Sequence, residues 1–114
     1  MTKVIGIHRL ELKPGVTEEQ VRPVLEQLTH EATLPGIKLM CGKGDRGERA
    51  GQYVLLIEIE SVETRDRYFP VPGGQPSAEY QELAARDSHL AEQFDQVFTN
   101  FPDPGYTDYV ITNE

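Results

Sequence analysis

Alternating and β-branched apolar runs mark four segments of the chain as strands. Residues 3–13 are rich in β-branched and apolar side chains, and residues 37–43 form a second, shorter run. Residues 52–61 alternate with the two-residue period of a strand, and residues 106–114 alternate more weakly. In the third segment one face carries Tyr53, Leu55, Ile57 and Ile59. We therefore predict four strands.

The three-to-four-residue spacing of apolar side chains predicts a first helix between strands one and two. Thr17 is placed to cap it and Gln20 to complete a capping box. Pro23 falls beyond the first turn, where it removes a backbone hydrogen bond, so we expect a bend or a later start. The apolar stripe of this helix consists of Val21, Val24, Leu25, Leu28 and Ala32.

Two further helices are expected after the third strand. Residues 61–69 predict a short helix capped by Ser61, and residues 77–101 predict one long helix with a wide apolar face. Three prolines and two glycines make residues 70–77 a loop, and the Pro-Asp-Pro-Gly run at 102–105 ends the long helix. The order strand, helix, strand, strand, helix, strand is that of a ferredoxin-like α+β fold with a four-stranded antiparallel sheet.

Gly42, Gly44 and Gly47 form a G-x-G-x-x-G spacing, which in other proteins holds the phosphates of a nucleotide. That chemistry requires a helix directly after the glycines, whose free N–H groups bind the phosphate. Here the glycines connect two predicted strands, so we interpret them as a hairpin and expect no nucleotide.

Apolar side chains lie on both faces of the predicted sheet. Ile5 and Ile7 alternate with Val4, Leu10 and Leu12, so both faces of the first strand are apolar. Two helices cover only one face. We therefore expect a second copy of the chain to cover the other in a homodimer, with residues 1–114 forming a single domain.

The charge and the cysteine content of the chain indicate which binding partners and which cellular compartment to expect. The 114 residues contain 11 Lys and Arg against 19 Asp and Glu, a net charge of −8, which disfavours nucleic acid and anionic membranes. The chain has one cysteine, Cys41, and no apolar segment typical of a signal peptide or a membrane span. We expect a cytoplasmic protein.

Residues 10–20 ("LELKPGVTEEQ") and 51–68 ("GQYVLLIEIESVETRDRY") resemble the stress-responsive dimeric α/β-barrel (Dabb) domains, as does the closing "TDYVI" at 107–111. The resemblance implies a ferredoxin-like protomer, a dimeric α/β barrel, and a cavity for a small, largely apolar organic molecule. Some plant members are polyketide cyclases that use histidines as acid and base.

Both histidine positions of that family are occupied differently in this chain. The position near the start of strand one is Gly6, and the family's His-Pro-x-His run falls on residues 71–74, of which only Pro72 matches. A cyclase mechanism that rests on those histidines is therefore not carried over.

His8 and Tyr68 are the candidate catalytic residues. His8 shares the face of Gly6 and titrates near neutral pH, so it can carry protons, although a structural core or rim histidine is the alternative. Tyr68 matches a tyrosine of the family's short helix, and its hydroxyl can orient a ligand carbonyl or simply pack under the loop. Arg9 and Glu11, on the opposite face, are interpreted as solvated charges. We expect no metal and no cofactor, and interpret Cys41 as an inert buried thiol.

These features predict a small-molecule-binding dimer. One hypothesis is a cofactor-independent lyase, cyclase or isomerase acting on an aromatic or polyketide-like compound. The alternatives are a non-catalytic stress-associated binding dimer and a cofactor-independent monooxygenase of the same fold. Whether the protein is an enzyme stays open, and any ligand is expected between sheet and helices.

Overall fold

Four strands and four helices make up the computed structural model, which describes residues 2–32, 34–99 and 103–113. The strands are β1 (Val4–Leu10), β2 (Ile37–Lys43), β3 (Tyr53–Ile59) and β4 (Thr107–Val110). The helices are α1 (Glu18–Glu31), α2 (Val62–Tyr68), α3 (Ala78–Ala85) and α4 (Ser88–Val97). The sheet has the order β2-β3-β1-β4 with every neighbouring pair antiparallel, which confirms the predicted α+β arrangement.

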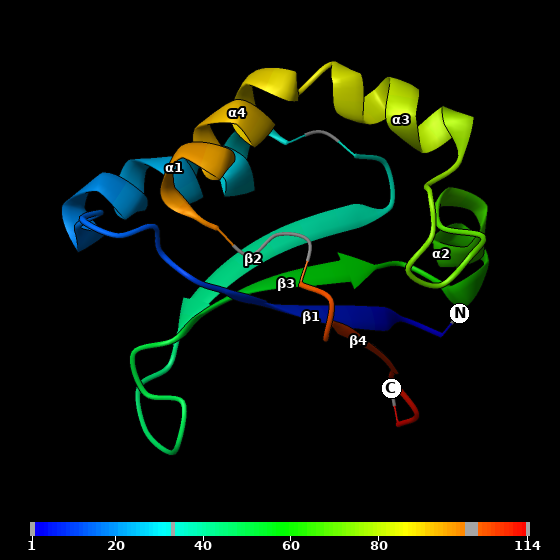
Figure 1. The fold of residues 1–114 in the computed structure, drawn as a ribbon. Helices are drawn as coiled ribbons and strands as arrows, with labels where there is room; N and C mark the ends of the chain where they lie inside the picture. The colour runs from blue at the N-terminus through cyan, green and yellow to red at the C-terminus, as the bar shows by residue number, and fades with distance from the viewer. Residues whose placement is uncertain (1, 33, 100–102, 114) are drawn as a thin grey trace.

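Helices α1, α3 and α4 lie over one face of the sheet, and α2 lies beside the end of the sheet near the N-terminus (Figure 1). The burial pattern of β1 agrees with this arrangement. Buried and half-buried residues alternate along the strand, and the buried set faces the helices. His8 belongs to that buried set and pairs across to Leu55 on β3. The core between the layers consists of Leu10, Val21, Tyr53, Leu55, Phe94, Val97 and Phe98.

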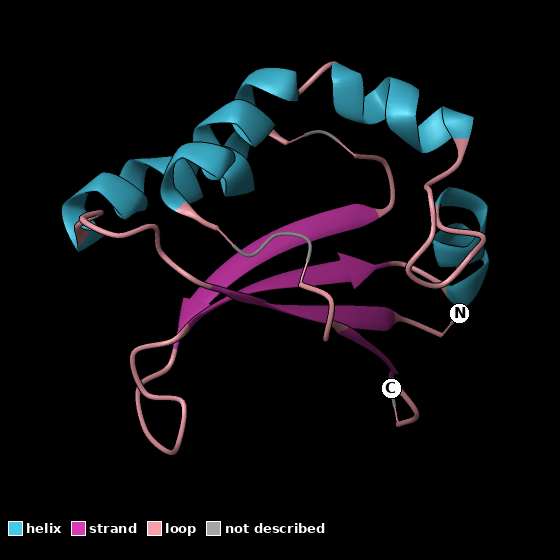
Figure 2. Cartoon of the chain, in the orientation of Figure 1, coloured by secondary structure: helices cyan, strands magenta, loops and turns pink. Residues whose placement is uncertain are grey.

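The opposite face of the sheet has no helix over it in the described part of the chain (Figure 2). Register places Ile7 opposite Leu56, and Leu56 opposite Met40, so an apolar row crosses β1, β3 and β2. These side chains are half-buried within the protomer. On β4 this row meets Thr107, which pairs with Ile7, while Tyr109, 52 % exposed, pairs with Ile5 in a neighbouring row.

Helix α1 begins where the capping box predicts, and the expectation of a later start is wrong. Thr17 is the N-cap, its backbone N–H donating to Gln20 Oε1 at 2.8 Å. Pro23 remains inside the helix and is exposed to solvent. The capping box and the burial of Val21 therefore outweigh the backbone hydrogen bond that Pro23 removes.

The single helix predicted for residues 77–101 is also wrong, because the segment forms two helices separated at Arg86 and Asp87. Asp87 leaves the helical conformation, with φ −109° and ψ 24°, and is the N-cap of α4. The amides of Arg86 and Asp87 donate to Leu83 and Ala84 carbonyls and close the turn. After the break, α4 buries Leu90, Phe94 and Val97, whereas no residue of α3 is buried. Helix α4 ends at Val97, because Phe98 is extended with φ −116° and ψ 142°, so the predicted helix end at residue 101 is also wrong.

Strands β1 and β4 are shorter than the sequence predicts. Strand β1 spans seven residues, after which Leu12 forms an isolated bridge to Phe98, and β4 spans only four. The glycine segment after β2 is a hairpin connection to β3, as expected. Gly47 and Gly51 have φ values of 105° and 90°, a conformation that side-chain-bearing residues rarely adopt.

Candidate functional site

The imidazole of His8 stacks on the ring of Tyr106. The two centroids are 5.0 Å apart and the ring planes differ by 3°. Tyr106 directly precedes β4, and the antiparallel pairing of β4 with β1 brings the two aromatic residues together. His8 is 9 % exposed, so its imidazole is largely shielded from solvent.

Gly6 leaves a space that Asp108 and His8 share. A Cβ atom at Gly6 would lie 2.7 Å from Asp108 Oδ1 and 3.9 Å from His8 Nε2. The carboxylate of Asp108 therefore occupies the position where a side chain at residue 6 would begin.

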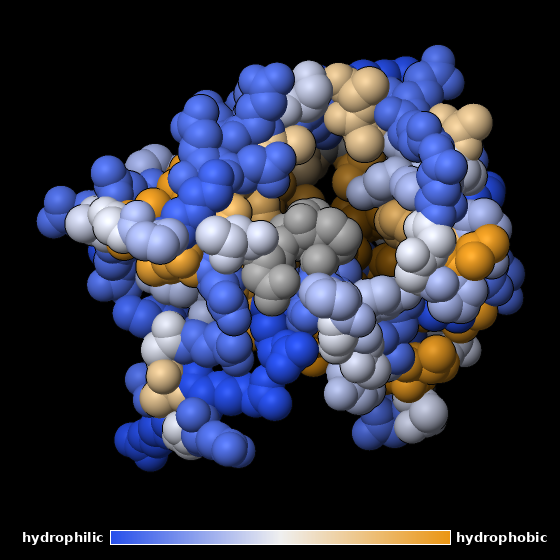
Figure 3. All heavy atoms as spheres, in the orientation of Figure 1, coloured by the Kyte–Doolittle hydropathy of each residue, from blue (hydrophilic) through white to orange (hydrophobic). Residues whose placement is uncertain are grey.

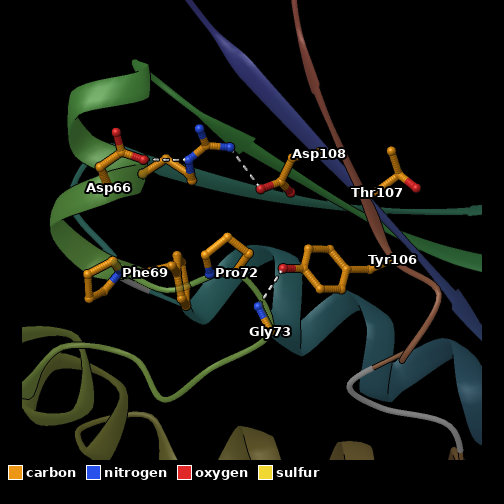
Figure 4. Close-up of a pocket in the computed structure, with 9 residues that line it drawn as sticks. Asp66, Phe69, Pro72, Gly73, Tyr106, Thr107 and Asp108 are labelled. Atoms are coloured by element: carbon orange, nitrogen blue, oxygen red, sulfur yellow. Dashed lines mark hydrogen bonds and ion pairs between the residues drawn. The ribbon is translucent and has the colours of Figure 1, made fainter.

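A pocket of about 540 Å³ opens between α2, the loop after it, and the start of β4 (Figure 4). One wall is a row of charges: Arg65 Nε donates to Asp66 Oδ1 at 2.8 Å, and Arg65 Nη1 donates to Asp108 Oδ2 at 3.1 Å. We call this space the open pocket. Its lining residues are Arg65, Asp66, Phe69, Pro70, Pro72, Gly73, Tyr106, Thr107 and Asp108.

The wall facing the charges is aromatic and proline-rich. Figure 4 shows Phe69, Pro72 and Tyr106 along this side, with the Tyr106 hydroxyl accepting a hydrogen bond from the Gly73 amide at 3.0 Å. That bond joins the loop at 70–77 to β4 across the pocket. The open pocket is therefore a slot with hydrogen-bonding groups on one side and flat apolar surfaces on the other.

Asp103 holds the turn that presents Tyr106. Its carboxylate accepts hydrogen bonds from the Arg9 amide (2.9 Å), from Arg9 Nε (3.1 Å) and from the Gly105 amide (2.8 Å). The hydrogen bond from the Arg9 side chain is the largest cause that lowers the pKa of Asp103 to about 2. The Arg9 side chain is 41 % exposed, in keeping with the expected solvated charge, but it also pairs with a carboxylate that is 1 % exposed, which the sequence did not indicate.

The pKa of His8 is lowered from its ordinary value of 6.5, chiefly because burial disfavours the charged imidazolium. The negative charges of Asp103 and Asp108 oppose this shift to a smaller extent. At neutral pH His8 is consequently neutral and able to accept a proton.

Tyr68 lies away from His8 and lines neither of the pockets described here. Its hydroxyl donates to the Pro35 carbonyl at 3.1 Å and accepts from Arg67 Nη2 at 3.1 Å. The ring is 1 % exposed and packs at a tilt against Tyr80. The structure therefore does not bring the two sequence-predicted catalytic residues into one site.

A second, smaller cavity of about 160 Å³ lies where the sequence analysis places a ligand, between the sheet and the helices. Figure 3 shows hydrophobic side chains in a hollow between the two layers. We call it the apolar cavity. Its lining residues are Leu28, Ala32, Leu34, Ile37, Leu39, Leu55, Ile57, Phe69, Tyr80, Ala84, Asp87, Leu90, Ala91, Phe94 and Asp95.

Cys41 lines neither the open pocket nor the apolar cavity. Burial raises the pKa of the Cys41 thiol to about 11, so the thiol is protonated at neutral pH. The described residues contain no group of three or more His, Cys, Asp or Glu side chains able to hold a metal ion. Within the same residues no helix is long and apolar enough to cross a membrane.

Sequence reasoning did not find Arg65, Asp103, Tyr106 and Asp108. Their only sequence signals are the Asp-Pro-Gly turn at 103–105 and the charged positions of the short helix. Neither signal indicates that these residues converge on His8.

Comparison with known proteins establishes the fold class. No protein-family model matches the chain, and no curated protein does. A solved structure of a dimeric protein of unknown function and ferredoxin-like fold from Bacteroides fragilis NCTC 9343 is similar, with a TM-score of 0.52 and 14 % identity. The similarity covers 96 % of this chain and 96 % of that one. The chain therefore has a ferredoxin-like fold, and the resemblance to Dabb domains stays a prediction.

Proposed function

We propose that this protein binds a small aromatic or polyketide-like molecule in the open pocket. The observation that carries the proposal is the pairing of an Asp66–Arg65–Asp108 row with a Phe69–Pro72–Tyr106 wall across one slot. A flat, oxygenated ring would place its faces against the apolar wall and its hydroxyl or carbonyl groups toward the charges.

Arg65 supplies the polar recognition in this proposal. A guanidinium has five N–H donors, and the ion pairs to Asp66 and Asp108 engage Nε and Nη1. The remaining donors can reach a ligand oxygen without breaking either pair. The two carboxylates add acceptors for ligand hydroxyl groups.

The catalytic form of the proposal is a cofactor-independent lyase, cyclase or isomerase in which His8 carries the proton. His8 does not line the pocket, so a proton would reach its neutral imidazole by way of Asp108, whose carboxylate lines the pocket, fills the space above Gly6 and would stabilise the imidazolium. Tyr68 would act from outside the slot, and its hydroxyl would have to leave the Pro35 carbonyl to reach a ligand.

We further propose that residues 1–114 act as one domain of a cytoplasmic homodimer with a dimeric α/β-barrel arrangement. The apolar row through Ile7, Leu56 and Met40 has no helix over it in the described residues. A second copy, related by a two-fold axis, would cover it. The dimeric state of the similar Bacteroides fragilis protein supports this assembly.

A non-catalytic stress-associated binding dimer is the second candidate. It is favoured by Gly6 and by the residues at 71–74, which lack the histidines of the Dabb pattern. A cofactor-independent monooxygenase of the same fold would use the same slot, and consumption of oxygen on turnover would distinguish it. The two enzymatic candidates require a bound ligand, whereas a non-catalytic dimer whose cavity is filled by side chains, with a structural His8, does not.

Binding of resorcinol and 1,8-dihydroxynaphthalene, measured by calorimetry, tests the proposal. We expect Tyr106→Ala to weaken binding about tenfold or more, because it removes the stacking wall. Tyr109→Ala is the matched control, since Tyr109 is an exposed tyrosine of β4, close to Tyr106 in the sequence, and does not line the pocket. Absence of binding to the unmodified protein, or equal weakening by both substitutions, would refute the proposal.

A further inference from the structure

The apolar cavity is a separate feature from the open pocket, and we propose that it is a second binding site. Its ligand is a single apolar ring or short chain that carries a cationic amine rather than a carboxylate. This inference does not depend on the proposed function, because it concerns different walls of the molecule. Among their described lining residues, the open pocket and the apolar cavity have Phe69 in common.

The size and lining of the cavity set the apolar part of the ligand. Its volume is about 160 Å³, and its walls are mainly Leu, Ile, Ala and Phe side chains. An apolar protein cavity of about 150 Å³ stays dry and binds benzene. A benzene-sized group therefore fits this cavity and removes its own surface from water.

Helix α3 forms a thin cover over this space. None of its residues is buried, and it contributes Tyr80 and the small Ala84 to the lining. The Tyr80 ring rests on Phe69, with centroids 4.6 Å apart, and burial raises the pKa of its phenol, which is therefore neutral at neutral pH. A small side chain at residue 84 leaves room that a larger one would fill.

The charges at the cavity determine which polar group the ligand carries. Asp87 and Asp95 are the charged residues among the described lining residues, which include no Lys, Arg or His. An ammonium group next to these carboxylates is attracted, whereas a carboxylate would be repelled and would find no basic partner. The net charge of −8 acts in the same direction.

Ligand-observed and protein-observed NMR with benzylamine, toluene and benzoate tests the inference. At low salt we expect benzylamine to bind about tenfold more tightly than benzoate, with toluene between them, and added salt to reduce this difference. Shifted resonances should map to Leu55, Leu90 and Phe94. Equal affinities for benzylamine and benzoate would overturn the charge assignment, and failure of all three to bind would overturn the site.

Matched substitutions on α3 separate cavity binding from surface association. Ala84→Leu fills the cavity and should lower benzylamine affinity about tenfold, whereas Ala85→Leu, on an exposed neighbouring position that does not line the cavity, should leave it unchanged. Equal effects would contradict the site. Unchanged binding in Tyr106→Ala is also expected. Loss of benzylamine binding in that variant would place the amine in the open pocket and refute the second site, while leaving the proposed function intact.

Discussion

His8 on β1 stacks in parallel on Tyr106, the residue before β4, with ring centroids 5.0 Å apart. This contact connects the helix-covered core to the open pocket, because His8 belongs to the buried face of β1 and Tyr106 lines the pocket. Asp103 fixes the turn before Tyr106, and Asp108 fills the space above Gly6 beside the imidazole.

The pKa of His8 should be lower than the 6.5 of an unperturbed histidine, because burial disfavours the imidazolium. Asp108→Asn removes a negative charge that raises this pKa, so it should lower the value further. NMR titration of the His8 ring protons measures both. A pKa at or above 6.5 in the unmodified protein, or an increase in Asp108→Asn, would contradict this description of the site.

The free energy of unfolding should fall as the pH decreases from about 7.5 through the range just below 6.5. In that window the unfolded chain binds a proton at His8 that the folded protein excludes, so acid favours unfolding. Denaturant unfolding at a series of pH values measures the slope. His8→Gln should flatten the curve in this window, and a slope that survives the substitution would assign the pH dependence to another group.

Asp103→Asn should destabilise the protein by about 2 kcal/mol, because it weakens the hydrogen bonds that Arg9 and Gly105 donate to a buried carboxylate. Asp45→Asn in the hairpin is the matched control, since Asp45 is almost fully exposed. Chemical denaturation at pH 7 gives both values. Comparable small effects at the two positions would mean that Asp103 does not hold the turn.

Asp103 should also produce a separate loss of stability in stronger acid. Its pKa is about 2 in the folded protein against an ordinary 3.8, so its stabilisation is present above about pH 4 and is lost as the pH falls toward 2. Asp103→Asn should reduce this acid-dependent step. An unchanged acid transition in the variant would show that other carboxylates cause it.

Leu56→Lys should convert the proposed dimer to a monomer, because it places a charge in the centre of the uncovered apolar row. Light scattering coupled to size exclusion measures the mass. Glu82→Lys, at an exposed position of α3, is the control for the added lysine and should remain dimeric. A monomeric unmodified protein at micromolar concentration would contradict the barrel.

The order of elements could be predicted from local patterns, because each strand and helix carries its own period and punctuation. The two-residue period around Tyr53 and the capping box at Thr17 depend only on near neighbours, and both gave the correct elements. The break at Asp87 could not be predicted in this way. The segment has an apolar period on both sides of it, and the separation reflects the packing of α4 on the sheet.

The candidate site was less predictable, since its residues converge from distant parts of the chain. Arg9 and Asp103 are 94 positions apart, and neither carries a local signal for the other. His8 was identified from its face on β1, but its contact with Tyr106 depends on the pairing of β1 with β4. Tyr68 fitted a sequence pattern, whereas its hydroxyl binds the Pro35 carbonyl.

The most direct test of the central claim is to locate a bound aromatic ligand on the protein. Intermolecular nuclear Overhauser effects from 1,8-dihydroxynaphthalene at saturating concentration report which side chains it touches. We predict contacts to Phe69, Pro72 and Tyr106, which line the open pocket. Contacts confined to residues of the apolar cavity, such as Leu55 and Leu90, or to the uncovered face around Leu56 would contradict the proposed function.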